Sequence, residues 1–213
     1  MKRKSLILLF IMVFVISNLS TAFAGTEKNT QEVKENEVTR TWTGKILNMN
    51  IDVQTQSYYC GPASGRAILS FFGHNVSQNQ LARDMGTTTN GTSPGGFLTG
   101  IVKYLGNQLY YNVSTSSKPF KTGTIESIDA DYPVGCAVMT GVLPIYEENN
   151  HNTGHFLVIK GYYDAFQGST GASRVVYLDP NNDTEYYGQQ ECVWSKMISA
   201  VQLGGGVYTM KRS

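Results

Sequence analysis

The sequence is poor in cysteine and histidine, with three of each among 213 residues. The cysteines, Cys60, Cys136 and Cys192, lie far apart, and none belongs to a Cys-x-x-Cys pair. This absence argues against a zinc site or a dithiol redox site of the usual spacing. Three cysteines also allow at most one internal disulfide, so at least one thiol is left over. We therefore expect no metal ion and no cofactor.

The sequence also lacks an apolar run long enough to span a membrane. The candidate run, from Leu6 to about Ile16, is shorter than the roughly 20 residues that a spanning helix needs. Three positive charges precede it, and an Ala-Phe-Ala stretch ending at Ala24 follows it. This order is typical of a secretory signal. We predict a signal peptide at 1–24, a secreted protein, and no stable membrane insertion once the signal is removed.

An excess of basic residues is missing as well. The chain carries 17 Lys and Arg residues against 16 Asp and Glu, and the predicted signal peptide holds three basic residues and no acidic one. The remaining 189 residues would have a net charge of −2 and are enough for one domain with a full core. Nucleic acid and anionic membrane surfaces attract basic proteins, so we expect neither as the main partner.

Residues 25–41 are polar and charged, with few bulky apolar side chains. Such a composition cannot offset the entropy lost on ordering, so we predict a flexible leader or short propeptide here. Apolar residues return at Trp42. We predict that residues 42–213 form one domain.

Helical patterns occupy the first half of that domain, and strand patterns occupy the second half. Periodic apolar residues with start and stop signals predict helices over 61–73, 77–85 and 93–106. Short β-branched or aromatic runs predict strands over 110–114, 133–142, 155–164, 174–179 and 206–210, with a helix over 191–201. Helices followed by a mainly antiparallel sheet indicate an α+β fold.

Cys60 stands at the predicted start of the first helix. A helix N-terminus carries partial positive charge and free N–H groups, which favour a thiolate over a thiol. His155 begins one predicted strand and Asp179 ends the next, so a base could take the thiol proton while a carboxylate orients the imidazole. Gln54, six residues before Cys60, could donate its amide to a developing oxyanion.

Several of these residues also have a structural, non-catalytic interpretation. Cys60 can instead be a structural thiol or half of a disulfide, and a Cys136–Cys192 bond is possible, although Cys136 lies in an apolar strand and is expected in the core. His151 lies in a polar loop and ranks below the predicted base, and His74 follows a helix end and is expected at the surface.

Three stretches of the sequence resemble the C39-like branch of papain-fold cysteine peptidases: Q-x5-C-G-P-A-S, then G-H-F-L-V-I-K-G-Y, then Y-L-D-P. The resemblance covers most of the chain and implies a papain-like fold. It also implies that Cys60 is the nucleophile, His155 the general base, Asp179 the group that orients it, and Gln54 the oxyanion donor.

Two of these assignments have a neighbouring competitor. Gln56 competes with Gln54, and the spacing in the family favours Gln54. Asn181 competes with Asp179, because an Asp-Pro pair often only caps a turn; we favour Asp179.

The best-known members of that family are fused to peptide transporters and cut leader peptides after a double glycine. We expect this chain to have its own export signal and no transporter segment, and we therefore predict a stand-alone, secreted cysteine peptidase that acts on a peptide or protein. The alternatives are a papain-like acyltransferase or amidase acting on a non-protein amide, which uses the same triad, and a catalytically silent binding domain.

Overall fold

A computed structural model describes residues 32–35, 38–41, 43–164 and 172–212. The predicted signal peptide and the first part of the predicted leader lie outside these residues. Strands β1 (Glu32–Glu35) and β2 (Val38–Thr41) pair with each other as a separate antiparallel sheet. The predicted flexible leader therefore contains two paired strands, and its role as a propeptide stays a prediction.

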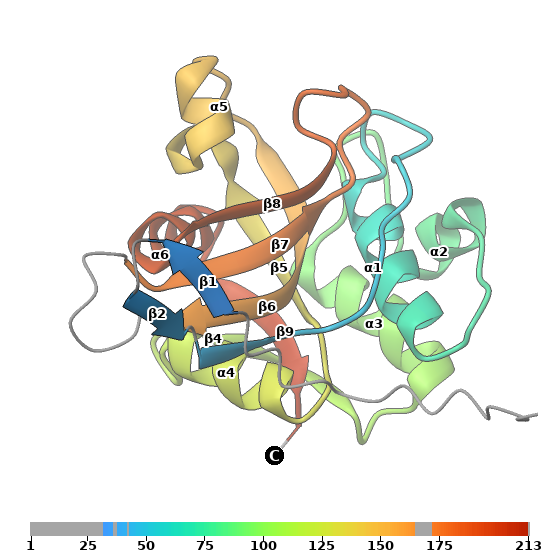
Figure 1. Ribbon diagram of the computed structural model, residues 1–213. Helices are drawn as coiled ribbons and strands as arrows, with labels where there is room; N and C mark the ends of the chain where they lie inside the picture. The colour runs from blue at the N-terminus through green and yellow to red at the C-terminus, as the bar shows by residue number, and fades with distance from the viewer. Residues whose placement is uncertain (1–31, 36–37, 42, 165–171, 213) are drawn as a thin grey trace, which may run out of the picture.

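The centre of the domain is a seven-stranded antiparallel sheet (Figure 1). Its longest strand, β6 (Gly154–Asp164), pairs with β5 (Val134–Met139) along its first half and with β3 (Thr43–Ile46) along its second half. Strand β7 (Arg174–Asp179) lies on the other side of β6. This pairing places the start of β6 beside the end of β7. The remaining strands are β8 (Gly188–Val193), β9 (Val207–Lys211) and β4 (Tyr110–Ser114), in the order β4-β9-β5-β6-β7-β8.

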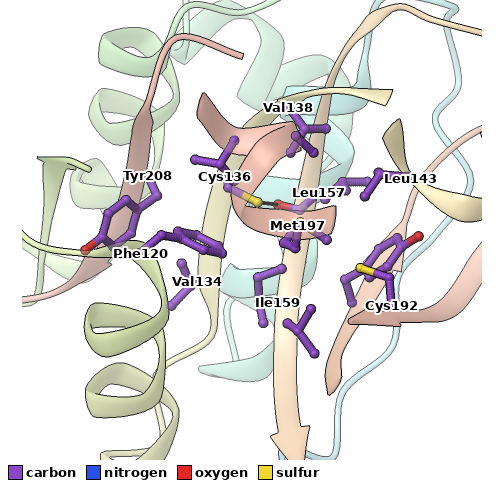
Figure 2. Close-up of a cluster of buried hydrophobic side chains, with 14 of the residues drawn as sticks. Phe120, Val134, Cys136, Val138, Leu143, Leu157, Ile159, Cys192, Met197 and Tyr208 are labelled. Atoms are coloured by element: carbon purple, nitrogen blue, oxygen red, sulfur yellow. Dashed lines mark hydrogen bonds between the residues drawn. The ribbon is translucent and has the colours of Figure 1, made fainter. Parts of the chain in front are cut away.

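Helices cover both faces of the sheet, so its central strands are apolar on both sides. Along β6, Phe156 and Val158 pack with core residues of the first three helices. Leu157 and Ile159 belong to a second core cluster with residues of the last helix (Figure 2). The helices are α1 (Cys60–Phe71), α2 (Gln78–Asp84), α3 (Pro94–Leu105), α4 (Phe120–Asp129), α5 (Pro144–Glu148) and α6 (Trp194–Leu203), with a short 3-10 helix at Thr140–Val142.

The α+β class with a mainly antiparallel sheet is confirmed. The three predicted N-terminal helices are present, and Ser77 and Ser93 cap α2 and α3 by accepting backbone N–H groups. The last predicted helix begins later than expected, at Trp194, because the residues before it pair with β7 as strand β8. Helix α4 was missed because its buried face includes Thr124 and Ser127, which dilute the apolar pattern.

All three cysteines are free thiols. Cys136 is on β5 and Cys192 on β8, with β6 and β7 between them. Three strand spacings amount to about 14 Å, roughly twice the Cα separation that a disulfide tolerates. The fold therefore excludes a Cys136–Cys192 bond. Burial raises the pKa of both thiols, that of Cys192 to about 12, and both are neutral core residues.

Among the described residues, no helix is both long enough and apolar enough to cross a bilayer.

Candidate active site

Cys60 is the first residue of α1 and packs against the start of β6. Its side chain is buried, and the groups that act on its thiol are the His155 ring and the backbone N–H groups of Gly61 and Phe156. Burial raises the pKa of the Cys60 thiol, but the hydrogen bond and charge of His155, together with the two backbone donors, outweigh burial and lower the pKa below its usual value. The site therefore favours a thiolate.

The residues after Cys60 explain how the start of α1 is held in place. Pro62 lies in the first helical turn, where its missing N–H is tolerated. A Cβ added at Gly61 would lie 2.4 Å from Thr92 Oγ1, so only glycine lets the 86–92 loop approach this closely. Ser64 Oγ donates a hydrogen bond of 3.1 Å to the carbonyl of Phe156 and ties α1 to β6 directly beside His155. Ser64 belongs to the C-G-P-A-S motif, but its bond to β6 cannot be recognised from the sequence.

His155 bridges the thiol and a carboxylate. Its Nε2 lies 2.8 Å from Asp179 Oδ1, and both side chains are buried. Since Nε2 faces the carboxylate, Nδ1 is the ring atom that faces Cys60. Burial lowers the pKa of His155, but the charge and hydrogen bond of Asp179, with a smaller contribution from Cys60, raise it to about 10. Asp179 thus favours the imidazolium form of His155, and His155 in turn favours the thiolate form of Cys60.

Asp179 is completely buried and accepts hydrogen bonds from three groups. Its Oδ1 accepts from His155 Nε2 at 2.8 Å and from the backbone N–H of Asn181 at 2.9 Å, and its Oδ2 accepts from the Tyr146 hydroxyl at 2.8 Å. The side chain of Asn181 donates to the Tyr146 hydroxyl at 3.0 Å. Between the two competitors, the imidazole therefore contacts Asp179. Tyr146 was missed, because α5 was not predicted.

Gln54 lies in the turn that leads into α1, and it is buried. Its Nε2 donates to the carbonyls of Gln56 at 3.1 Å and of Ser57 at 2.9 Å, so both amide hydrogens are directed into the turn. Its Oε1 is buried without a hydrogen-bond partner among the described residues. In this arrangement Gln54 stabilises the turn by its two hydrogen bonds, and its role as an oxyanion donor stays a prediction. Gln56 takes part through its backbone carbonyl, and its side chain is exposed.

The other two histidines lie apart from the thiol. The exposed ring of His151 stacks on Tyr146 and Tyr186, with centroid separations of 5.6 Å in each case. His74, predicted at the surface, is partly exposed beside Tyr104. Of the three histidines, His155 is the one that the fold brings against Cys60.

Within the described part of the chain, no group of three or more His, Cys, Asp or Glu side chains is arranged to hold a metal ion.

Comparison with known families gives a match to the Peptidase_C39 like family over residues 46–201. The matched range includes all four residues predicted for the site and lies inside the predicted domain. No curated protein sequence matches the chain.

Three solved structures share the fold. A C39-like peptidase from Bacillus anthracis is 19% identical, with a TM-score of 0.56, over 79% of this chain and 97% of that one. The peptidase domain of Streptococcus ComA, a bi-functional ABC transporter of a quorum sensing pathway, is 17% identical, with a TM-score of 0.50, over 76% and 96%. A double glycine motif protease from an AMS/PCAT transporter, solved in complex with a leader peptide, is 15% identical, with a TM-score of 0.50, over 79% and 94%. The papain-like peptidase fold is thereby confirmed.

Proposed function

The chain belongs to the Peptidase_C39 like family, and we propose that it is a cysteine peptidase in which Cys60 attacks the substrate carbonyl. The observation that carries this proposal is the buried contact chain from the Cys60 sulfur through the His155 ring to Asp179. A thiolate at a helix start, beside an imidazole that a carboxylate orients, is the arrangement that nucleophilic acyl transfer requires.

The proposed reaction proceeds in two halves. The Cys60 thiolate attacks the carbonyl carbon, and the imidazolium of His155 gives its proton to the leaving amine as the carbon–nitrogen bond breaks. This leaves a thioester on Cys60 and a neutral His155. The neutral ring then takes a proton from water, whose oxygen attacks the thioester and releases the acid. The thiolate and imidazolium are restored.

The oxyanion of the first half needs hydrogen-bond donors. The N–H of Cys60 belongs to the first turn of α1, whose N–H groups have no acceptor within the helix. We assign the second donor to Gln54, whose amide group would have to rotate away from the carbonyls of Gln56 and Ser57 to reach the oxyanion. Two such donors would stabilise the tetrahedral intermediate more than the planar substrate.

The substrate class that this proposal assigns is a peptide or protein outside the cell. The co-structure of the double glycine motif protease with a leader peptide supports a peptide substrate. Secretion rests on the charged, apolar and small-residue order of residues 1–24.

Two measurements on the intact protein test the proposal. Iodoacetamide at mildly acidic pH should label Cys60 well before Cys136 and Cys192, because Cys60 is the one of the three thiols whose pKa is lowered. Digestion of a peptide library, followed by mass spectrometry, should show cleavage that Cys60→Ser abolishes while the circular dichroism spectrum is unchanged. Equally slow labelling of all three thiols would contradict the proposal and favour a binding domain. Hydrolysis of non-peptide amides to acid and amine, without peptide cleavage, would favour the amidase alternative, and formation of a new amide would favour the acyltransferase.

A further inference from the structure

The second oxygen of the Asp179 carboxylate is held by a side chain outside the predicted triad. Tyr146 is fully buried, and its hydroxyl lies 2.8 Å from Asp179 Oδ2. An ionised carboxylate only accepts hydrogen bonds, so the single hydroxyl hydrogen must point at Asp179. Asn181 Nδ2 donates to the same hydroxyl oxygen at 3.0 Å and occupies a lone pair on it. The direction of the hydroxyl is therefore fixed from both sides.

We propose that Tyr146 is a positioning residue of this peptidase: its hydroxyl, oriented by Asn181, sets the rotation of the Asp179 carboxylate so that Oδ1 meets His155 Nε2. This inference rests on the proposed function of Cys60, His155 and Asp179.

A carboxylate in this position needs such a constraint. The terminal torsion of an aspartate is broad, so packing alone does not select one rotation. Oδ1 already accepts from His155 and from the Asn181 N–H, whereas Tyr146 is the donor that the structure gives to Oδ2. Without that donor, a buried and charged oxygen would lose its hydrogen bond, and the rotation of the carboxylate would be held at Oδ1 alone.

The ring of Tyr146 is itself held by stacking. It lies against Tyr186 with a centroid separation of 4.2 Å and an interplanar angle of 9°. Asn149 Nδ2 also donates to Glu185 Oε1 at 3.0 Å. These contacts join α5 to the β7–β8 connection at the end of the molecule where α1 begins (Figure 1). These contacts hold the ring in place, and the ring in turn fixes the position of its hydroxyl next to Asp179.

Tyr146→Phe is the direct test, because it removes the hydroxyl and keeps the stacked ring. Tyr110→Phe is the matched control: Tyr110 is equally buried, and its hydroxyl donates to the carbonyl of Pro133 at 2.9 Å, outside the site. We expect Tyr146→Phe to lower kcat by about 10- to 100-fold, with KM little changed. This fold-change corresponds to the free energy of one hydrogen bond to a charged group. Tyr110→Phe should keep the wild-type kcat. Equal kcat values in both variants would overturn the inference.

A double-mutant cycle with Asp179→Asn decides whether Tyr146 acts through Asp179. If it does, adding Tyr146→Phe to Asp179→Asn should change kcat by less than about twofold. A further loss as large as that in the wild-type background would overturn the positioning role. If Tyr146→Phe does not fold, Asn181→Ala is the second test, because it keeps the Tyr146 hydroxyl but removes the donor that orients it. This variant should lower kcat without raising KM. An unchanged kcat would count against the inference.

Failure of the proposed function looks different from failure of this inference. If Cys60→Ser still cleaves peptides, the catalytic chain itself is wrong. If Cys60→Ser is inactive while Tyr146→Phe and Asn181→Ala match the wild type, only the positioning role is wrong.

Discussion

The two sides of the candidate site hold their residues by different means. On the helix side, Cys60 is placed by its own neighbours in the chain, which form a turn and the first helical residues. On the sheet side, His155 and Asp179 come from adjacent strands, and Asp179 is held by donors from β6, from the residues after β7 and from α5. Short-range geometry places Cys60 at a helix start, whereas long-range packing brings His155 against it and surrounds Asp179 with donors.

The largest effect should come from the sheet side. His155→Ala should lower kcat by about a thousandfold or more, because the base and the proton donor are lost together. His155→Gln, which retains an amide donor for Asp179, should be as inactive but more stable than His155→Ala. His151→Ala serves as the control on the neighbouring exposed ring and should cost little. A comparison of kcat with thermal unfolding for the three variants checks this, and a reversal of severity between positions 151 and 155 would show that the base is misassigned.

Gln54 tests whether the helix side also acts on the transition state. Gln54→Ala should lower kcat by roughly a hundred- to a thousandfold, with KM little changed, as expected for loss of one oxyanion donor. Gln56→Ala should stay near wild type, because its backbone carbonyl is what the turn uses.

The alkylation rate of Cys60 distinguishes the oxyanion role of Gln54 from its role in stabilising the turn before α1. Rapid labelling should survive Gln54→Ala if the thiolate depends on His155 and the helix start. An unchanged kcat in Gln54→Ala would leave Gln54 with only the structural role that its bonds to residues 56 and 57 show.

The coupling between the two sides predicts a bell-shaped pH dependence of kcat/KM. Activity should fall as the pH drops through the lowered pKa of Cys60, since the thiolate gains a proton, and as the pH rises through about 10, since His155 loses its proton. Each limb should approach about a tenfold change per pH unit. Asp179→Asn removes the charge that raises the His155 pKa, so its upper limb should move to lower pH. An upper limb unmoved by this substitution would contradict the assignment.

The same pKa shifts give the sign of the effect on stability. The His155 pKa is raised from 6.5 to about 10, so its contribution to the free energy of unfolding is complete below pH 6.5 and is lost as the pH rises through about 10. The Cys60 pKa is lowered from 9.0, so its contribution is present above pH 9.0 and is lost as the pH falls through the folded-state value.

The smallest effect should come from the contact that joins the two sides. Ser64→Ala removes the hydrogen bond to the Phe156 carbonyl and leaves that buried acceptor without this donor. The free energy of unfolding should fall by about 1–3 kcal/mol, with kcat reduced only a few fold. Chemical denaturation and steady-state kinetics measure both. A large loss of kcat at unchanged stability would mean that Ser64 has a more direct role than docking α1 on β6.

Local patterns sufficed for the helix side of the site. Gly61 and Pro62 marked the start of α1, and Ser77 and Ser93 marked the next two helices, because capping and helix propensity act over a few residues. The strand containing His155 was also recognisable, since it is buried on both faces and is therefore continuously apolar.

Local patterns did not suffice for α4, α5 and β8. Five residues in α5 are too few to show a helical period, and β8, at the edge of the sheet, has three consecutive polar residues at 189–191 in place of an alternating pattern. Tyr146 could not be singled out among 13 tyrosines, because its role depends on a contact with Asp179, 33 residues away.

The sequence by itself determined the three N-terminal helices and the main strands that follow them, the helix start at Cys60 and the residue types able to form a triad, because these follow from short-range spacing. The tertiary structure decided which side chains meet. It placed β6 and β7 between Cys136 and Cys192, paired His155 with Asp179 rather than Asn181, and directed the Gln54 amide into its own turn. The contacts that form depend on strand register, which sets the face on which each side chain lies. They also depend on burial, because a buried polar group has no water and can bond only to the partners that the fold supplies.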